Sequence, residues 1–421
     1  MHSLKSSLRA LLPAPLLSLY HFALAFLGAT VYRHPSGKLI VIAVTGTKGK
    51  TSTTELINAV FEAGGYKTAL LNSIHMSTGE GMHENPVGRS MPGRFFIQRF
   101  LARAVQNGCT VAIIEMTSEG ARQHRHRFLE LDALVFTNLA PEHIESHGSL
   151  QAYKDAKFSI ALQLARSRKR PRSIVANALD PESARYLALP IEEKRPFSLA
   201  SRTPWQADER GGHFMFEGVD IITTLPGEFS LRNALAAADM GHAFGIAPRD
   251  IARGIASLTA IPGRAERVEC GQDFIVVVDY AHTPESLRAL CDAYAGRQRI
   301  CVLGSAGGGR DTWKRPVMGR TAEENAERVI LTNDDPYDED PMQILGEMAA
   351  GMKTKPDIIP DRRLAIRTAL RAAKPGNAVL ITGKGIDPIA GPHGTKIPWS
   401  DVEVAREELE SLLRGGAILS T

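Results

Sequence analysis

The stretch KLIVIAVTGTKGKTSTTEL (residues 38–56) constrains the fold more than any other part of the sequence. Its apolar, β-branched start predicts a buried strand that ends near Gly46, and the residues from Lys50 onward have the spacing of a helix. A glycine-rich turn between a strand and a helix directs backbone N–H groups toward a bound anion, as in phosphate-binding loops. The usual loop would have a further glycine where this chain has Val44.

Single residues of this loop can each be given a role in holding a nucleoside triphosphate. Gly46 and Gly49 would let the backbone approach phosphate oxygens, and Lys50 would supply positive charge at the terminal phosphates. Thr51 could place its hydroxyl on Mg²⁺. A glycine-rich turn without function is the alternative, and the strand before it and the Lys-Thr pair at the helix start disfavour that alternative.

Alternation of strands and helices predicts an α/β fold with a parallel sheet. Two more apolar strands are predicted to end at Glu115 and near Asn138, and the same rhythm restarts after residues 261–264. We therefore predict three parts: residues 1–36, an apolar helical segment; residues 37–261, a P-loop-type ATPase domain with a parallel sheet; and residues 262–421, a smaller Rossmann-like α/β domain. A cleft between the two domains would hold the substrate.

Charge and cysteine content limit the function classes. The 50 basic and 46 acidic residues give a formal charge of +4, which is too mild to predict a nucleic-acid-binding protein. The four cysteines form no CxxC pair, which favours a reduced, cytosolic compartment.

The N-terminal segment is apolar from residue 10 to residue 32 and carries no formal charge there. It is long enough to span a bilayer, but Pro13 and Pro15 interrupt its first third. We predict a short helix that lies on a membrane surface or docks on the protein, and a transmembrane anchor is the alternative.

Several acidic and basic residues follow the predicted strands. Glu115 at a strand end is a candidate magnesium ligand, with a solvated acid as the alternative. His143 and His147 have a spacing that could bind zinc, but the sequence offers no good third ligand. The basic run RQHRHR (residues 122–127) is either a solvated helix face or a contact for an anionic substrate.

Five ordered motifs resemble the Mur ligase family over residues 38 to the end: GTKGKTST, TNLAPEHIESHGSLQAYKDAK, IPGRAERV, VDYAHTPESL and GGGRDTWKRPVMG. The resemblance implies an enzyme that forms an acyl phosphate from a substrate carboxylate and ATP. The amine of an amino acid then displaces phosphate and forms an amide.

The resemblance also implies roles for individual residues. Nucleotide binding would fall to Gly46, Thr47, Gly49, Lys50, Thr51, Ser52, Asn233 (adenine), Arg264 (terminal phosphate), Asp279 (ribose) and His282. Metal binding would fall to Thr51, Glu115, His143 and Lys157, and catalysis to Lys50, Lys157, His143 and Arg264. Substrate binding would fall to Thr117, Ser118, Gln123, Arg125, Arg310, Asp334, Asp335, Tyr337, Gly383 and Asp387. Lys157 would be carbamylated, which turns a cation into an anionic metal ligand.

The sequence departs from the family pattern in three places. Only the apolar segment precedes the loop, so we expect the chain to lack the usual N-terminal uridine-binding domain of the family, and Ser90-Met91-Pro92 replaces the usual Thr-Thr-Pro. Tyr337 stands where diaminopimelate-adding members have an arginine, and the acids Asp335, Asp338 and Glu339 would suit a cationic side chain such as that of lysine or ornithine. Solvated loop acids are the alternative. The stretch Gly383 to Asp387 reads GKGID instead of GKGHE.

These observations predict an ATP- and Mg²⁺-dependent ligase that adds a diamino acid to UDP-MurNAc-L-Ala-D-Glu or a related muramyl precursor in peptidoglycan synthesis. We expect a cytoplasmic monomer without nucleic-acid partners, and contact of residues 10–32 with the inner membrane surface stays open. Two alternatives remain. One is a poly-γ-glutamate synthase-like or folylpolyglutamate synthase-like ligase, and the other is a catalytically idle, membrane-associated nucleotide-binding scaffold.

Overall fold

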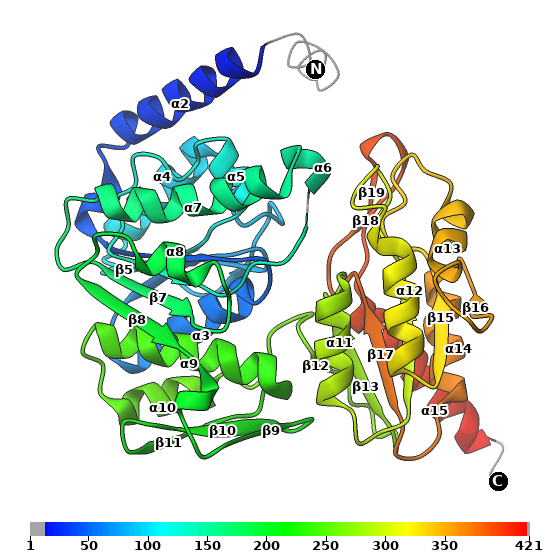
Figure 1. Cartoon of the computed structure of the whole chain (residues 1–421). Coiled ribbons are helices and arrows are strands. Elements are labelled where there is room, and N and C mark those ends of the chain that lie inside the picture. Colours follow the sequence, from blue (N-terminus) through cyan, green and yellow to red (C-terminus); the bar gives the residue numbers. More distant parts are fainter. Residues whose placement is uncertain (1–12, 143, 419–421) are drawn as a thin grey trace.

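A computed structural model describes residues 13–142 and 144–418 of the chain (Figure 1). Two α/β units stand side by side, one coloured blue to green and the other yellow to red. The α/β class predicted from the sequence is confirmed.

The first unit contains an eight-stranded sheet in the order β4-β3-β2-β5-β1-β6-β7-β8. All neighbouring strands pair in parallel except at β3 and β4, which form an antiparallel edge. The strands are β1 (Ile40–Thr45), β2 (Thr68–Leu71), β3 (His75–Ser77), β4 (His83–Glu84), β5 (Val111–Glu115), β6 (Ala133–Phe136), β7 (Ser173–Asn177) and β8 (Glu193–Phe197).

Helices cover both faces of this sheet. One apolar cluster joins the sheet to α3, α9 and α10, and a second cluster joins the opposite face to α4 and α7. The helices are α2 (Ala14–Val31), η1 (Pro35–Lys38), α3 (Lys50–Ala63), α4 (Arg94–Gln106), α5 (Ser118–Arg122), α6 (Ile144–His147), α7 (Leu150–Arg166), α8 (Ser183–Leu187), η2 (Leu199–Ser201), α9 (Gly227–Ala243) and α10 (Pro248–Ser257). A small antiparallel sheet of β9 (Trp205–Asp208), β10 (Gly211–Phe216) and β11 (Val219–Thr223) packs beside α9.

The second unit contains a six-stranded sheet in the order β12-β13-β17-β14-β15-β16, in which only β12 runs antiparallel to its neighbour. Its strands are β12 (Glu266–Arg267), β13 (Ile275–Asp279), β14 (Arg299–Leu303), β15 (Arg328–Leu331), β16 (Asp357–Ile358) and β17 (Ala378–Thr382), with a hairpin of β18 (Ile389–Ala390) and β19 (Lys396–Ile397). Its helices are α11 (Pro284–Ala293), α12 (Lys314–Asn325), α13 (Pro341–Ala349), α14 (Arg362–Ala372), η3 (Pro392–Gly394) and α15 (Asp401–Ile418).

The parallel register places the site. Val44 of β1 pairs with Glu115 of β5, and Thr45 pairs with Phe136 of β6. Three strands therefore end at the same edge, where ligands bind in open α/β sheets. The phosphate-binding loop and the Glu115 carboxylate lie at this edge.

Helix α2 docks on α4 at the outside of the first unit. Docking on the protein was one of the two placements predicted for the apolar segment. Within the described part of the chain, none of the helices combines the length and hydropathy that a membrane span requires. Residues 10–12 of the segment lie outside the described residues.

Candidate functional site: a nucleotide cleft between the two units

A cleft of about 890 Å³ lies between the two units, with walls from both. Most of the residues singled out in the sequence line it: Thr47, Gly49, Lys50, Thr51, Ser52, Glu115, Thr117, Ser118, Gln123, Arg125, Asn233, Arg264, Asp279, His282, Arg310, Asp334, Asp335, Gly383 and Asp387. Gly46, Lys157 and Tyr337 lie outside its lining. His143 lies outside the described residues.

Two glycines give the loop its shape. Gly46 has φ +147°, and a Cβ there would lie 2.0 Å from Thr137 Oγ1. Gly49 has φ +81°, and a Cβ there would lie 2.5 Å from Asn233 Oδ1. Because both positions exclude a side chain, the backbone between them can approach a phosphate closely.

Asn138 holds the outer part of the loop. Its carbonyl oxygen accepts a hydrogen bond from Thr47 N at 2.8 Å, and its Oδ1 accepts from Lys48 N at 2.9 Å. Lys50 begins α3, and its Nζ donates to the Thr47 carbonyl at 2.8 Å. A lysine at the start of α3 lies where the helix dipole and its own charge both favour an anion.

Hydroxyl and carboxylate oxygens lie close together beside the loop. Thr51 Oγ1 donates to Glu115 Oε2 at 3.0 Å, and the same oxygen accepts from Ser73 N at 3.1 Å. Thr51 Oγ1 also lies 3.0 Å from Ser73 Oγ. Hydroxyl and carboxylate oxygens fit Mg²⁺, which takes few protein ligands and completes its shell with phosphate and water.

Lys157 lies behind the loop. Its side chain is buried, Nζ donates to the Gly46 carbonyl at 2.6 Å and sits 4.8 Å from the centre of the Tyr153 ring. Burial, together with the nearby charges of Lys50 and Lys48, holds the pKa of Lys157 well below its usual range. A buried amine without a carboxylate partner takes a backbone carbonyl instead, which explains why it faces the loop and not the cleft.

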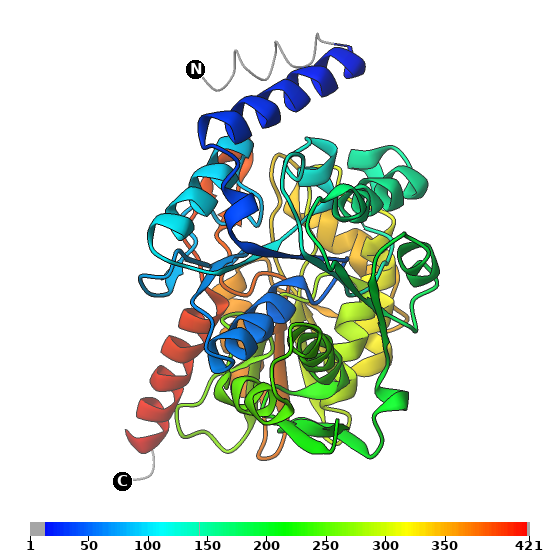
Figure 2. The ribbon, with the colours of Figure 1, turned by 90° about the vertical axis from the view of Figure 1, so that its left-hand side faces the viewer.

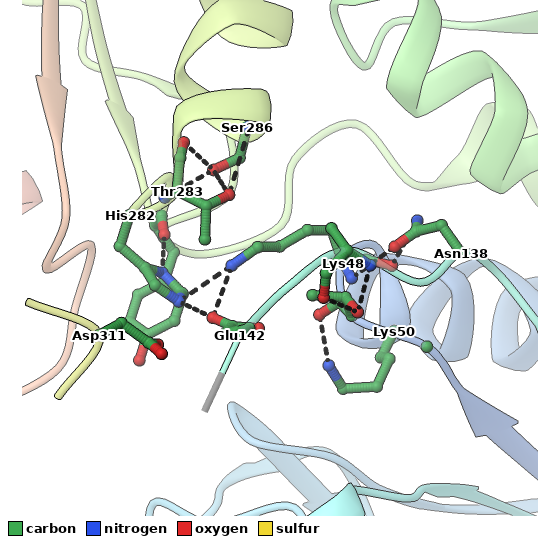
Figure 3. Close-up of polar contacts among 12 residues, drawn as sticks. Lys48, Lys50, Asn138, Glu142, His282, Thr283, Ser286 and Asp311 are labelled. Carbon is green, nitrogen blue, oxygen red and sulfur yellow. Dashed lines mark hydrogen bonds and ion pairs between the residues drawn. The ribbon is translucent and has the colours of Figure 1, made fainter. Parts of the chain in front are cut away.

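A three-residue bridge joins the loop to the second unit (Figure 3). Lys48 Nζ lies 2.9 Å from Glu142 Oε1 and 2.9 Å from His282 Nε2. Glu142 Oε1 and His282 Nε2 are 2.5 Å apart, and His282 Nδ1 is 2.7 Å from the Tyr280 carbonyl oxygen. Burial lowers the pKa of Lys48 to about 8, and burial together with the Lys48 charge lowers the pKa of His282 to about 4.

Three residues expected to hold the nucleotide come from both units. Asn233 of α9 accepts a hydrogen bond from Thr53 Oγ1 at 3.3 Å. The Arg264 guanidinium lies 4.2 Å from the centre of the Tyr280 ring. Asp279 Oδ2 accepts from Ala265 N at 2.7 Å, and burial raises the pKa of this carboxyl.

The wall expected to hold the acceptor is built around α5. Thr117 caps this helix by accepting from Gly120 N at 3.1 Å, and Ser118 Oγ lies 3.2 Å from His147 Nε2. Arg125 donates to Gln123 Oε1 at 2.8 Å and to the Met91 carbonyl. Polar side chains thus face the cleft from an ordered network.

In the wall expected to hold the incoming amino acid, charged side chains already pair with other groups of the chain. Lys384 Nζ donates to Asp335 Oδ1 at 2.7 Å and lies 3.9 Å from Asp334. The Arg310 guanidinium lies 4.8 Å from the centre of the Tyr337 ring.

Glu339, outside this wall, pairs with Arg315 at 2.7 Å, and Asp338 Oδ1 accepts from His393 N at 2.8 Å. These acids and Asp335 therefore have partners within the chain, which weakens the interpretation that they await a cationic substrate.

The possible zinc pair of His143 and His147 is only half described, because His143 lies outside the described residues. Among residues 13–142 and 144–418, no group of three or more His, Cys, Asp and Glu side chains could hold a metal ion. His147 instead contacts Ser118, as described above.

Sequence reasoning missed the bridge. Glu142 and Asn138 both lie in the motif TNLAPEHIESHG, and Lys48 lies in GTKGKTST, but none of the three received a binding role. The available signal was an acid beside a candidate metal ligand. Its partner His282 is 140 residues away, and only the fold brings it close.

Fold and cleft together define a two-domain α/β protein that presents a phosphate-binding loop, a hydroxyl and a carboxylate to a cleft. Family models agree with this class. The Mur ligase middle domain matches residues 44–241, and the glutamate ligase domain of Mur ligases matches residues 263–385.

Relatives of known name cover most of the chain. A UDP-N-acetylmuramoyl-L-alanyl-D-glutamate–2,6-diaminopimelate ligase from Syntrophomonas wolfei is 36% identical over 409 residues, which is 93% of this chain and 82% of the relative. A UDP-N-acetylmuramyl-tripeptide synthetase from Roseiflexus is 36% identical over 426 residues, or 94% and 83% of the two chains. The chain therefore belongs to the Mur ligase family of ATP-dependent ligases, as its motifs indicated.

Solved structures show the same fold. A 2,6-diaminopimelate ligase structure with 28% identity has a TM-score of 0.60 and covers 89% of this chain and 79% of its own. A folylpolyglutamate synthase from Mycobacterium tuberculosis, complexed with ADP and AMPPCP, has 18% identity and a TM-score of 0.68, with 92% and 95% of the two chains covered.

Proposed function

We propose that this chain is a muramyl peptide ligase that uses ATP and Mg²⁺ to join an amino acid to UDP-MurNAc-L-Ala-D-Glu or a related muramyl precursor. The main structural support is the hydrogen bond between Thr51 and Glu115, two residues that line the cleft beside the glycine-rich loop. The family membership and the names of the relatives support the same reaction class.

The reaction would proceed in two balanced steps. A carboxylate oxygen of the acceptor attacks the terminal phosphorus of ATP, and ADP leaves. The amine of the amino acid then attacks the activated carbonyl carbon, phosphate leaves, and the nitrogen loses a proton. Bound ATP and Mg²⁺ supply the phosphoryl group and the charge neutralisation.

The chain's own residues provide the setting for these steps. Lys50 and the loop N–H groups would hold the terminal phosphates, and Thr51 and Glu115 would hold the metal. Arg264, Asp279 and Asn233 would hold the nucleotide from the facing walls. Contact between both units around the cleft would keep water from the reactive intermediate.

We further propose that Lys157 becomes carbamylated. A lowered pKa increases the fraction of neutral amine, which is the form that adds CO₂ and then loses a proton to become a carbamate. The negative carbamate would leave the Gly46 carbonyl and turn toward the loop metal. Incubation with ¹³C-bicarbonate should give a carbamate carbon signal in NMR spectra that is absent from Lys157→Arg, and an unchanged spectrum in the two proteins contradicts the proposal.

We also propose that the chain divides into residues 1–36, 37–261 and 262–421 and that the protein is a cytoplasmic monomer. The added substrate would be a diamino acid. The remaining nucleotide- and substrate-binding residues would have the roles that the family resemblance implies.

A substrate panel tests the reaction. The purified chain is incubated with ATP, Mg²⁺ and muramyl acceptors, each combined with lysine, ornithine or meso-diaminopimelate, and products are read by mass spectrometry. We expect a new amide with one muramyl acceptor, and Lys50→Ala should lose at least about a hundredfold in phosphate release, because the lysine stabilises transition-state charge. Lys355→Ala, an exposed lysine outside the cleft, is the matched control.

Each other outcome assigns a different function. Product formation only with folate or glutamate acceptors would support the glutamate-adding alternative. The idle scaffold would be supported if the chain binds nucleotide but forms no amide product, and if Lys50→Ala captures protein partners as well as the unaltered chain does.

A further inference from the structure

Helix α2 is apolar on every side. Its 18 residues, APLLSLYHFALAFLGATV, contain no Asp, Glu, Lys or Arg. A helix of this kind is normally buried all round, either in a protein core or in a lipid environment. In this structure it is buried on one side only.

The inner face of α2 packs on the first unit through small residues. Ala25, Gly28 and Ala29 are buried, and a Cβ at Gly28 would lie 3.7 Å from the backbone of Arg94 at the start of α4. Phe22 and Phe26 lie at the edge between the two sides of α2: their rings pack on Phe128, with ring centres 5.0 and 5.4 Å apart, and both stay partly exposed. The helix is therefore held on the protein and presents its other side outward.

The outer face of α2 is the main apolar surface of the described chain. It consists of Leu16, Leu19, Tyr20, Phe22, Phe26, Leu27 and Val31, which are 41–63% exposed. These are seven of the sixteen exposed large hydrophobic residues among residues 13–142 and 144–418, so exposed apolar side chains are concentrated on this one helix. Figures 1 and 2 both show α2 standing out from the body of the first unit, with none of the other helices or strands beyond it.

Positive charge gathers in the same part of the sequence. Residues 1–40 contain Lys5, Arg9, Arg33 and Lys38 and no acid, whereas the rest of the chain has 46 basic and 46 acidic residues. The whole formal charge of +4 thus belongs to this segment. Arg33 and Lys38 are exposed just beyond the C-terminal end of α2.

We propose that the outer face of α2 binds the surface of a membrane that contains anionic lipids. The helix lies in the interface, its apolar side chains enter the boundary between headgroups and acyl chains, and Arg33 and Lys38 contact lipid phosphates. Tyr20 suits this depth because its ring is apolar and its hydroxyl is polar. Charge complementarity selects a lipid surface over a second copy of the chain, which would bring like charges together.

Vesicle flotation with the full chain tests this proposal. Neutral phosphatidylcholine vesicles are compared with vesicles that also contain phosphatidylglycerol, at low and high salt. Leu19→Gln with Leu27→Gln removes apolar contact without changing charge, and Arg33→Gln with Lys38→Gln removes charge without changing apolar contact. Leu179→Gln with Ile222→Gln is the control, because these two residues are similarly exposed and lie elsewhere.

We expect the unaltered chain to bind anionic vesicles at least about tenfold more tightly than neutral ones, and high salt should weaken that preference. The Leu19/Leu27 variant should lose about tenfold or more in binding, and the Arg33/Lys38 variant should lose the preference for anionic lipid. Binding that is absent, or equal in the Leu19/Leu27 variant and its control, overturns the proposal. A dimer in light scattering that only the Leu19/Leu27 variant lacks also overturns it and assigns the face to a second copy.

Discussion

At the scale of single residues, Lys48 joins the two halves of the site. It belongs to the phosphate-binding loop, yet its ammonium contacts Glu142 from the first unit and His282 from the second. The bridge is made of the chain's own groups, so the closed arrangement of the cleft has support before a nucleotide arrives.

Replacing Lys48 with asparagine should therefore raise the KM for ATP by about tenfold to a hundredfold. The change removes charge-assisted hydrogen bonds of about 1.5–3 kcal/mol from the closed arrangement. Steady-state phosphate release measures the effect. Lys355→Asn is the control, and an unaltered KM in Lys48→Asn would show that closure does not depend on the bridge.

His126 gives the protein a pH-dependent stability. It is 1% exposed, and burial, with Arg127 nearby, lowers its pKa to about 3. The unfolded chain binds a proton near pH 6.5, whereas the folded chain does not until much lower pH. The free energy of unfolding is therefore not reduced by His126 above about pH 6.5, and it falls as the pH falls from 6.5 toward 3.

Urea unfolding at pH 7.5 and pH 5 measures this effect. We expect His126 to cost about 1.4 kcal/mol of unfolding free energy for each pH unit below 6.5. His126→Gln should show a flatter pH dependence than the unaltered chain. The same slope in both proteins would assign the pH dependence to other groups.

At the scale of elements, the helix that starts at the phosphate-binding loop is positioned by a close helix contact. Gly254 of α10 lies against α3, where a Cβ would be 2.6 Å from the Ala59 carbonyl oxygen and 2.7 Å from Val60 Cα. The two helices can approach only because residue 254 has no side chain.

Gly254→Ala should destabilise the protein by about 1–3 kcal/mol, because the backbone of α3 or α10 must shift. Gly346→Ala in α13 is the matched control, since nothing lies within 4 Å of a Cβ there. That control should be stabilised by about 0.5–1 kcal/mol, because alanine favours a helix over glycine. Equal effects at the two positions would contradict the close-packing explanation.

Elements also show how far sequence reasoning reaches. The strands before Gly46 and at Glu115 were found because buried parallel strands are continuous apolar runs, and the loop between strand and helix followed from its glycines. The small sheet β9–β11 was missed because its strands mix buried and exposed residues and carry no continuous buried run. The bridge from Lys48 was missed because its partners are distant in sequence, and Lys157 was expected at the metal, whereas an unmodified amine turns to a carbonyl.

At the scale of the whole molecule, a second link between the units lies away from the loop. Arg297 of the second unit forms a bidentate pair with Glu209 of the first, at 2.5 and 2.9 Å, and this pairing lowers the pKa of Glu209. Arg267 also donates to the Glu209 carbonyl at 2.8 Å. Two links therefore hold the units in one relative orientation.

Glu209→Gln should loosen that orientation. An ion pair at a partly exposed site is worth about 1 kcal/mol, so we expect a rise of about fivefold in the KM for ATP and a larger radius of gyration in small-angle scattering without nucleotide. Glu217→Gln removes a weaker ion pair with Arg202 inside the first unit and should change neither the KM for ATP nor the radius of gyration. Identical scattering from both variants and the unaltered chain would exclude Glu209 as a link.

The turn that follows α5 contacts helix α2 on one side and lines the cleft on the other. Ser18 of α2 lies 2.8 Å from His124 Nε2, and the residues on either side, Gln123 and Arg125, line the cleft. Events at the outside of the molecule and events at the acceptor wall thus act on the same few peptide units. By thermodynamic reciprocity, any surface that tightens acceptor capture through this turn must itself be held more firmly once the acceptor is in place.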